Sequence, residues 1–96
     1  MTGSETTTYV QAVVDELAVR LPDCDVSLLR LYALLVFVKG TGATLEDVHD
    51  AWALWRMATR PGHPSIVPFW ALPVEIQELD RPYMEAIHAV AEGDLQ

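Results

Sequence analysis

The stretch VSLLRLYALLVFV, Val26–Val38, decides the fold of this 96-residue chain. Asp25 is a favourable N-cap and Gly40 can adopt the left-handed conformation that ends helices, so we predict a helix from Asp25 to Lys39. Because this helix is apolar on nearly every side, it should lie at the centre of a helical protein. It is too short to cross a bilayer, and it carries Arg30. Three neighbouring helices can hardly cover it, so we expect either an apolar loop or a second subunit to complete the cover.

Two further helices are predicted on either side of this stretch. Thr8 and Gln11 match a capping box that opens a helix, and Pro22 ends it. The apolar stripe of this helix consists of Val10, Val13, Val14, Leu17 and Leu21. Thr44 is a suitable N-cap for another helix, which we expect from about Leu45 to Thr59. The inward stripe of that helix consists of Leu45, Val48, Trp52 and Trp55.

The segment HPSIVPFWALP, His63–Pro73, contains three prolines, which exclude a regular helix and the middle of a sheet. We predict an ordered apolar loop that packs on helices. The residues after it can form one or two helical turns. Asp80 then serves as a fresh N-cap for a last helix that starts at Arg81, because Pro82 is tolerated only in a first turn, and ends near Gly93. The buried side of this helix consists of Tyr83, Met84, Ile87, Val90 and Ala91.

Together these elements predict an all-α fold, a compact single-domain bundle of four main helices with an ordered proline-rich loop before the last helix. Hydrophobic residues make up 51% of the chain and charged residues 21%, which is ample material for one core. We expect a flexible N-terminus over residues 1–7, a single helical domain over residues 8–93 and a C-terminal tail over residues 94–96.

The charge balance excludes some partners. Six Lys and Arg residues against 14 Asp and Glu residues give a net charge of −8, which argues against binding a nucleic-acid polymer. The single cysteine, Cys24, cannot form an internal disulfide, so a reducing cytoplasm is the expected compartment. The N-terminal residues lack the basic and apolar parts of a signal peptide, and no segment predicts contact with a membrane.

One window of the sequence, residues 51–74, contains no acidic residue. It holds all the tryptophans, two arginines and a histidine: Trp52, Trp55, Arg56, Arg60, His63 and Trp70. Guanidinium groups bind phosphate or carboxylate, and indole rings stack on planar groups. The window therefore predicts a site for a small anionic or nucleotide-like ligand.

We expect this site between the third helix, the proline-rich loop and the start of the last helix. The expected roles are charge recognition by Arg56, Arg60 and Arg81, hydrogen-bond donation by His49 and His63, and stacking by Trp52 or Trp70. Two plainer interpretations stay open. Tryptophans at helical spacing, Trp55 above all, usually belong to a core, and Arg56 and Arg60 can pair with Glu75, Glu78 or Asp80.

Catalytic and metal-binding motifs are weaker candidates. The histidines and the cysteine show no metal-ligand spacing, since two helical histidines must be three or four residues apart to share one metal. The sequence has no glycine-rich phosphate loop, nucleophile elbow or paired-carboxylate motif. We predict a protein that is not an enzyme and uses no metal or cofactor.

Several motifs of the second half follow a recognisable order. A helical His-x-x-Trp comes first, then His-Pro, an apolar pair before Pro-aromatic, a leucine, and Asp-Arg opening a helix. The matching positions are His49, Trp52, His63, Pro64, Val67, Pro68, Phe69, Leu72, Asp80 and Arg81. This order resembles the ryanodine-receptor repeat (RyR) domain, which has a longer segment with Gly-Trp between its two histidine motifs. With its EDVHDAW and VPF segments, the whole chain also resembles small uncharacterised proteins of actinobacteria and their phages.

The resemblance implies a helical module without catalysis that senses nucleotide-derived ligands in bacterial or phage conflicts. We therefore predict a binding module that senses or sequesters a small anionic or nucleotide-like ligand. The alternative is a protein-interaction or regulatory module that uses the proline-rich loop and the apolar helix Val26–Val38 as its surface. A homodimer is expected because of that helix. An enzyme is a third alternative, which no motif supports.

Overall fold

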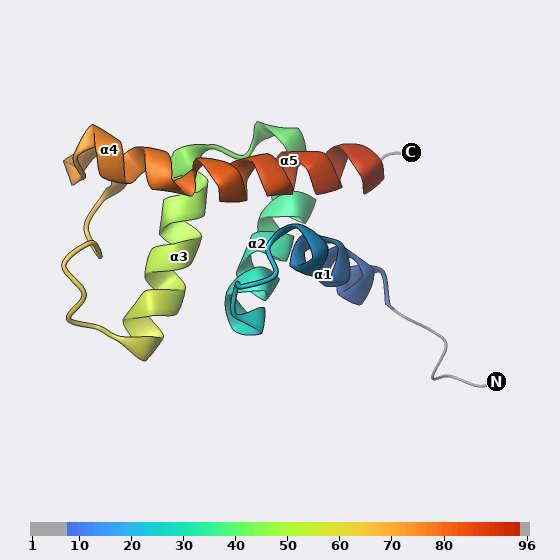
Figure 1. The fold of residues 1–96 in the computed structure, drawn as a ribbon, viewed down its shortest axis with the longest axis horizontal. Coiled ribbons are helices and arrows are strands. Elements are labelled where there is room, and N and C mark those ends of the chain that lie inside the picture. Colours follow the sequence, from blue (N-terminus) through green and yellow to red (C-terminus); the bar gives the residue numbers. More distant parts are fainter. Residues whose placement is uncertain (1–7, 95–96) are drawn as a thin grey trace.

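Four long helices make up most of the computed structural model, which describes residues 8–94. They are α1 (Tyr9–Arg20), α2 (Val26–Val38), α3 (Leu45–Thr59) and α5 (Arg81–Asp94) (Figure 1). Short elements connect them: a one-turn helix, α4 (Val74–Gln77), and the 3-10 turns η2 (Gly40–Gly42), η3 (Phe69–Ala71) and η4 (Glu78–Asp80). The predicted all-α fold with four main helices is confirmed. The expected flexible N-terminus and the last two residues of the expected tail lie outside the described residues.

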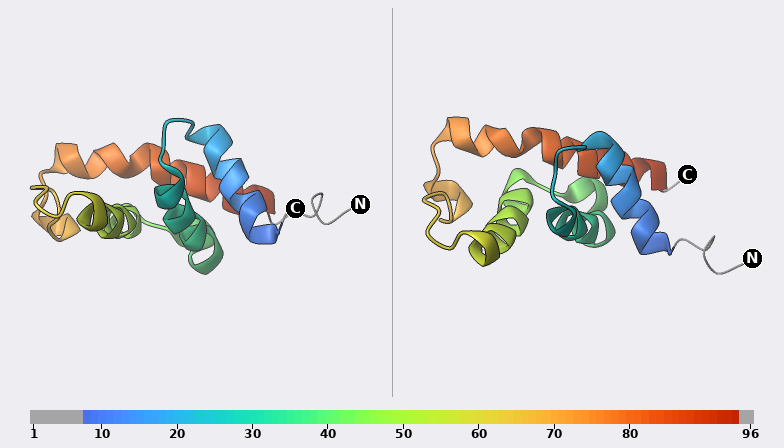
Figure 2. Two further views of the ribbon diagram at one scale, coloured as in Figure 1. Left: turned by 90° about the horizontal axis from the view of Figure 1, so that it is seen from below. Right: turned by 60° about the horizontal axis from the view of Figure 1, so that its bottom comes forward.

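α5 runs along one side of the molecule, and the other long helices pack against it (Figure 1). Viewed from below, α2 and α3 lie side by side along α5 (Figure 2). α2 contacts α1, α3 and α5, so the predicted central position of this helix is confirmed. Its buried residues are Leu28, Leu29, Tyr32, Ala33 and Val36. None of the helices within residues 8–94 has the length and apolar character needed to span a bilayer.

The predicted caps start three of the helices. The Thr8 hydroxyl accepts a hydrogen bond from the Gln11 amide at the start of α1, but the Gln11 side chain donates to Asp15 instead of returning to the cap. The Asp25 carboxylate accepts from the Ser27 amide at the start of α2. α3 begins with a complete capping box, in which Thr44 and Asp47 each accept from the other's backbone amide. At the end of α2, Gly40 has a φ of 55°, as a left-handed stop requires.

The start of the last helix differs from the prediction. Asp80 does not cap α5, because the helical backbone continues from Gln77 through η4 into Arg81 without an extended residue. An N-cap needs that extended conformation to turn its side chain back onto the helix. Pro82, which has no amide hydrogen, is accommodated by the 3-10 turn that precedes it. α5 also runs to Asp94, one residue beyond the predicted end at Gly93.

The proline-rich loop, His63–Pro73, lies outside the long helices as predicted, and it packs on α3. Phe69 is only 3% exposed, and the Val67 carbonyl accepts a hydrogen bond of 2.6 Å from Nε2 of His49. The loop does not cover the outer face of α2, where Leu34, Phe37 and Val38 are 54%, 40% and 63% exposed. The loop is therefore not the cover that was expected for this face of α2. The second subunit, the other expected cover, stays a prediction.

Candidate functional site

A cavity of about 660 Å³ lies between α2, α3, the proline-rich loop and the junction of η4 with α5. Its side chains come from the turn before α2, from α2 and α3, from the proline-rich loop, and from α4, η4 and α5. The aromatic and histidine residues that line it are Tyr32, His49, Trp52, Trp55, His63 and Tyr83. The charged residues and the thiol are Asp23, Cys24, Asp25, Arg56 and Asp80, and the remaining lining residues are Leu28, Ser65, Leu72, Ile76 and Leu79. A cavity of this size is typical of small-molecule sites.

α3 supplies one wall of the cavity through residues on successive turns. His49 is 3% exposed, and its ring stacks against Trp52 with 5.7 Å between the ring centroids. Because Nε2 of His49 donates to the Val67 carbonyl, this nitrogen is engaged within the chain and fixes the loop on α3. Trp52 lies between the His49 ring and the His63 ring, which meets the indole edge-on at 5.1 Å. Trp52 thus forms the centre of an aromatic wall.

Arg56 adds a positive charge to this aromatic wall. Its guanidinium carbon lies 4.4 Å from the centroid of the Trp55 ring and 6.0 Å from that of Trp52. Nη1 donates to the Thr59 hydroxyl at 3.3 Å, whereas Nε is buried and has no hydrogen-bond partner among the described residues. Neither of the ion pairs found within residues 8–94 includes Arg56. The alternative interpretation, in which Arg56 pairs with Glu75, Glu78 or Asp80, is therefore wrong.

Trp55 belongs to the framework of the site, as its helical spacing indicated. Its ring packs against the hydrophobic core, and its Nε1 donates to the Ser27 hydroxyl at 3.1 Å. Ser27 in turn donates to the carboxylate of Asp25. This chain of hydrogen bonds holds the start of α2 next to the second half of α3, and it places a carboxylate near the Arg56 end of the cavity.

His63 faces the cavity from the loop with a defined tautomer. Its Nδ1 accepts a hydrogen bond from the Ser65 amide at 3.1 Å, so in the neutral ring the proton lies on Nε2. Partial burial lowers the pKa of His63 below its ordinary value, and the charges of Arg60 and Arg56 lower it further. A neutral His63 can therefore donate one hydrogen bond, and an anion bound beside it would favour its protonation.

Another part of the lining consists of Tyr32, Tyr83 and Asp80. Tyr32 is 1% exposed, and its ring lies 5.7 Å from the ring of Tyr83. Burial raises the pKa of Tyr32, which keeps its hydroxyl protonated. Burial also raises the pKa of Asp80 above its ordinary 3.8, and His49 opposes part of this rise. No hydrogen bond or ion pair of the Asp80 carboxylate is found within residues 8–94.

Cys24 lines the cavity without the features of a nucleophile. Burial raises the pKa of its thiol above the ordinary 9.0, and the negative charge of Asp25 adds to this effect. A thiol under these conditions stays protonated and unreactive. Within residues 8–94, no three His, Cys, Asp or Glu side chains gather closely enough to hold a metal ion.

The structure brings together four of the seven predicted site residues: His49, Trp52, Arg56 and His63. Arg60, Trp70 and Arg81 do not line the cavity. Arg60 is the exposed C-cap residue of α3, and Arg81 forms an ion pair with Glu78 through contacts of 2.6 and 3.1 Å. Trp70 is 72% exposed, because η3 turns its neighbour Phe69 into the protein and leaves the indole outside, edge-on to Phe69.

Sequence reasoning missed the acidic side of the cavity. Asp23 and Asp25 come from the turn before α2, and Asp80 comes from η4, so all three lie outside the acid-free window of the sequence. Asp80 was predicted to cap the last helix, and its place in the cavity was not expected. The site is therefore mixed in charge rather than cationic.

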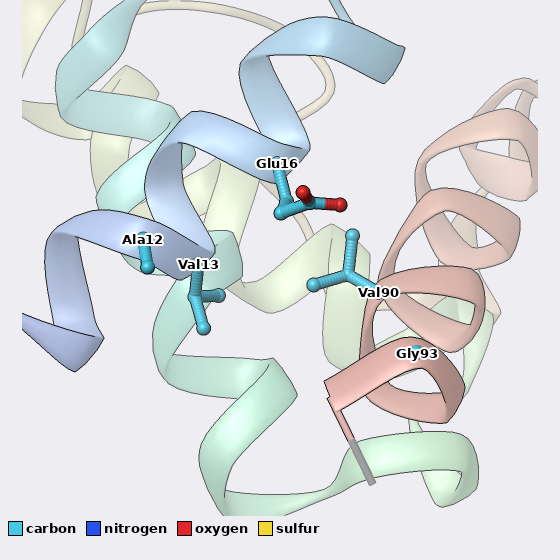
Figure 3. Close-up of a pocket in the computed structure, with 5 residues that line it drawn as sticks. All are labelled: Ala12, Val13, Glu16, Val90 and Gly93. Atoms are coloured by element: carbon cyan, nitrogen blue, oxygen red, sulfur yellow. The ribbon is translucent and has the colours of Figure 1, made fainter. Parts of the chain in front are cut away.

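A second hollow, of about 280 Å³, lies between α1 and α5 (Figure 3). Ala12, Val13 and Glu16 of α1 face Val90 and Gly93 of α5 across it. Glu16 is the one side chain of this hollow that carries a charge, and none of the predicted site residues takes part. The larger cavity is the stronger candidate.

Comparison with known proteins identifies a family. A family model described as a domain of unknown function, DUF7701, matches residues 8–92. The chain belongs to the DUF7701 family. No curated protein and no solved structure matches it. The DUF7701 match begins at the cap of α1 and extends through most of α5, so the family corresponds to the whole helical bundle.

The DUF7701 match corrects the resemblance stated from the motifs. The chain shows no match to the RyR domain, and the assignment to RyR-like and actinobacterial or phage proteins was wrong. The motifs have local explanations in the DUF7701 structure: His49 fixes the loop, and Asp-Arg lies inside a continuous helical run. Such dipeptides suit many loops and helix starts, so their order alone does not identify a family.

Proposed function

We propose that this DUF7701 protein is a non-enzymatic binding module whose cavity takes a small planar ligand with one anionic group. The observation that carries the proposal is the setting of Arg56. Its guanidinium lines the cavity against two indole rings and has no carboxylate partner among the described residues. A half-buried cation in such a setting is stabilised by an anion that accepts its hydrogen bonds.

The aromatic wall supports the planar part of the ligand. Trp52 is half-buried at the centre of the wall, and Tyr32 and Tyr83 face the same cavity from α2 and α5. Flat rings with polar edges give a planar ligand both stacking surface and hydrogen bonds. The defence context implied by the RyR resemblance is withdrawn with that resemblance.

The acidic lining limits the charge of the ligand. Asp23, Asp25 and Asp80 surround a cavity that has one arginine, and the whole chain carries a net charge of −8. A polyanion would meet these carboxylates, whereas a single anionic group beside Arg56 would not. The proposed ligand is therefore a small anion and not a nucleic-acid polymer.

The test is ligand binding by the wild-type protein and by Arg56→Ala. A panel of planar anions, including nucleoside monophosphates, is screened by thermal shift and by quenching of tryptophan fluorescence. A ligand that binds only the folded state raises the melting temperature by mass action. Arg56→Ala should weaken binding by about 1.5 to 3 kcal/mol, the usual cost of losing a hydrogen bond to a charged group.

The matched control is Arg30→Ala, which removes an exposed arginine from α2. This variant should bind the same ligand with wild-type affinity. Should the two variants weaken binding equally, the arginine would act only through net charge, and the proposed role of the cavity would be wrong. An absence of binding to every planar anion would also count against the proposal.

A second candidate function rests on exposed apolar residues around the cavity, of which Leu79 also lines it. Trp70, Val74 and Leu79 are 72%, 68% and 62% exposed, and they follow one another along η3, α4 and η4. Clusters of exposed apolar side chains often bind other proteins. A pull-down that recovers one stoichiometric partner with the wild type but not with Trp70→Ala would support this interaction module. The same variant should leave ligand binding in the cavity unchanged.

A further inference from the structure

Two polar groups without a hydrogen-bond partner among the described residues lie at different heights along α3 in the cavity. The Asp80 carboxylate accepts no hydrogen bond from residues 8–94, and Arg56 has a buried Nε without an acceptor there. η4, which carries Asp80, contacts α3, and the charge of His49 acts on the Asp80 carboxylate, so Asp80 lies near the His49 turn of α3. Arg56 lies two turns further along the same helix, about 10 Å away at the usual rise per residue. Within the described part of the chain, the cavity thus offers a free acceptor, the Asp80 carboxylate, at one end and a free donor, Nε of Arg56, at the other.

The aromatic rings lie between these two ends. Trp52 is on the turn of α3 between His49 and Arg56, and its ring contacts both His49 and His63. Because all three residues line one cavity, a ligand that reaches from Asp80 to Arg56 would lie beside this indole. Its middle part is accordingly flat, and its two ends differ in hydrogen-bonding character.

We infer that the ligand is a planar N-heterocycle with two adjacent N–H donors, as on a guanine base, joined to one phosphate group. This inference rests on the proposed function of the cavity. A carboxylate offers two oxygens side by side, which pair with two parallel N–H groups. Guanine presents such a pair on its N1 and 2-amino edge. Its ring stacks beside Trp52, and the phosphate of the nucleotide meets Arg56 and His63.

The number of phosphates is limited by the carboxylate of Asp25. The hydrogen bonds from Trp55 to Ser27 and from Ser27 to Asp25 place this group near the ring on which Arg56 stacks. Each phosphate added beyond the first brings negative charge toward Asp25 without another arginine in the lining. The monophosphate is therefore preferred to the triphosphate.

The first experiment compares ligands on the wild-type protein by titration calorimetry. GMP is expected to bind about tenfold or more tightly than IMP, which lacks the 2-amino donor, and AMP is expected to bind more weakly than GMP because its N1 accepts instead of donating. GTP is expected to bind more weakly than GMP. Equal affinity for GMP, IMP and AMP would overturn the inference.

The second experiment uses Asp80→Asn, which keeps the shape of the side chain but replaces one acceptor with a donor. The variant should lose about tenfold or more of its affinity for GMP. It should gain affinity for XMP, whose C2 carbonyl accepts from the new amide while N1–H still donates. A merely structural role of Asp80 would not reverse the preference between these ligands. Asp50→Asn, an exposed change on α3, is the matched control and should keep the wild-type order.

The outcomes separate the two proposals. Binding that depends on Arg56 but shows no preference among the bases and no response to Asp80→Asn would overturn the guanine inference and leave the binding module intact. If no planar anion binds the wild type at all, both proposals fail. If Asp80→Asn does not fold, the comparison of GMP, IMP and AMP on the wild type still decides the inference.

Discussion

Asp80 shows how one residue can matter to a site at a cost in stability. Its carboxyl is half-buried, and it has neither a cap to form nor an ion pair among the described residues. Burial raises its pKa above the ordinary 3.8, because the charged form loses hydration that nothing in the described chain replaces. Groups with such shifts are often found at functional sites.

This shift predicts a pH dependence of stability for the protein without ligand. The folded state holds the Asp80 proton more tightly than the unfolded state, so the free energy of unfolding decreases as the pH rises from about 3.8 through the raised pKa. Asp80→Asn removes the charge and should melt at a higher temperature than the wild type at pH 7. The difference should shrink as the pH falls toward 4. Melting curves of both proteins between pH 4 and 8 measure it.

The opposite result would change the interpretation of Asp80. If Asp80→Asn melts below the wild type at pH 7, the carboxylate has a structural partner and its charge stabilises the fold. Replacing an N-cap residue usually lowers the free energy of unfolding by about 1 kcal/mol. Asp80 lies within a helical run, so no such loss is expected from its substitution.

At the scale of elements, two histidines attach irregular segments to the helices. Nε2 of His49 donates to the Val67 carbonyl of the proline-rich loop, and Nε2 of His88 donates to the Ala43 carbonyl in the turn between α2 and α3. The two hydrogen bonds measure 2.6 and 2.7 Å. Each links residues far apart in the sequence, so neither pairing could be derived from local patterns.

These two similar hydrogen bonds provide a matched pair of variants for hydrogen-exchange measurements. His49→Ala should speed exchange of the Ala71 and Leu72 amides, whose hydrogen bonds lie within the loop. His88→Ala should speed exchange of the Gly42 and Ala43 amides and leave the loop protected. Each variant is the control for the other. Faster exchange of both segments in both variants would show a general loss of stability instead of local release.

At the scale of the whole molecule, α2 remains partly uncovered. Leu34, Phe37 and Val38 are exposed on its outer face, and Tyr9 of α1 packs edge-on against Phe37. The proline-rich loop lies on α3 and the cavity, so it cannot also cover this face. Association of two copies would bury these side chains together with their counterparts.

We therefore predict a homodimer, measured by light scattering at high micromolar concentration. Leu34→Lys should shift the protein toward the monomer, because a buried interface does not tolerate an unpaired lysine. Val19→Lys is the control, since Val19 is 82% exposed and belongs to α1 instead of α2. A wild-type protein that stays monomeric under these conditions would contradict the prediction.

Local sequence patterns determined the helices and the order in which they follow one another. Apolar periodicity predicted most of the buried faces, although Val10 is 43% exposed and His49 joins the buried face of α3. Thr8, Asp25 and Thr44 fixed helix starts, and Gly40 fixed the end of α2. These signals act between residues that are near in sequence, so they can be interpreted without knowledge of the fold. The proline spacing excluded a helix over His63–Pro73 for the same reason.

Only the tertiary structure decided which of these residues share a cavity. The acid-free window predicted a cationic patch, but folding brings Asp23, Asp25 and Asp80 to the same space as Arg56. It also leaves Trp70 outside and pairs Arg81 with Glu78. The charge of a site depends on which side chains the packed helices place together, and residues distant in sequence contribute to it as strongly as neighbours do.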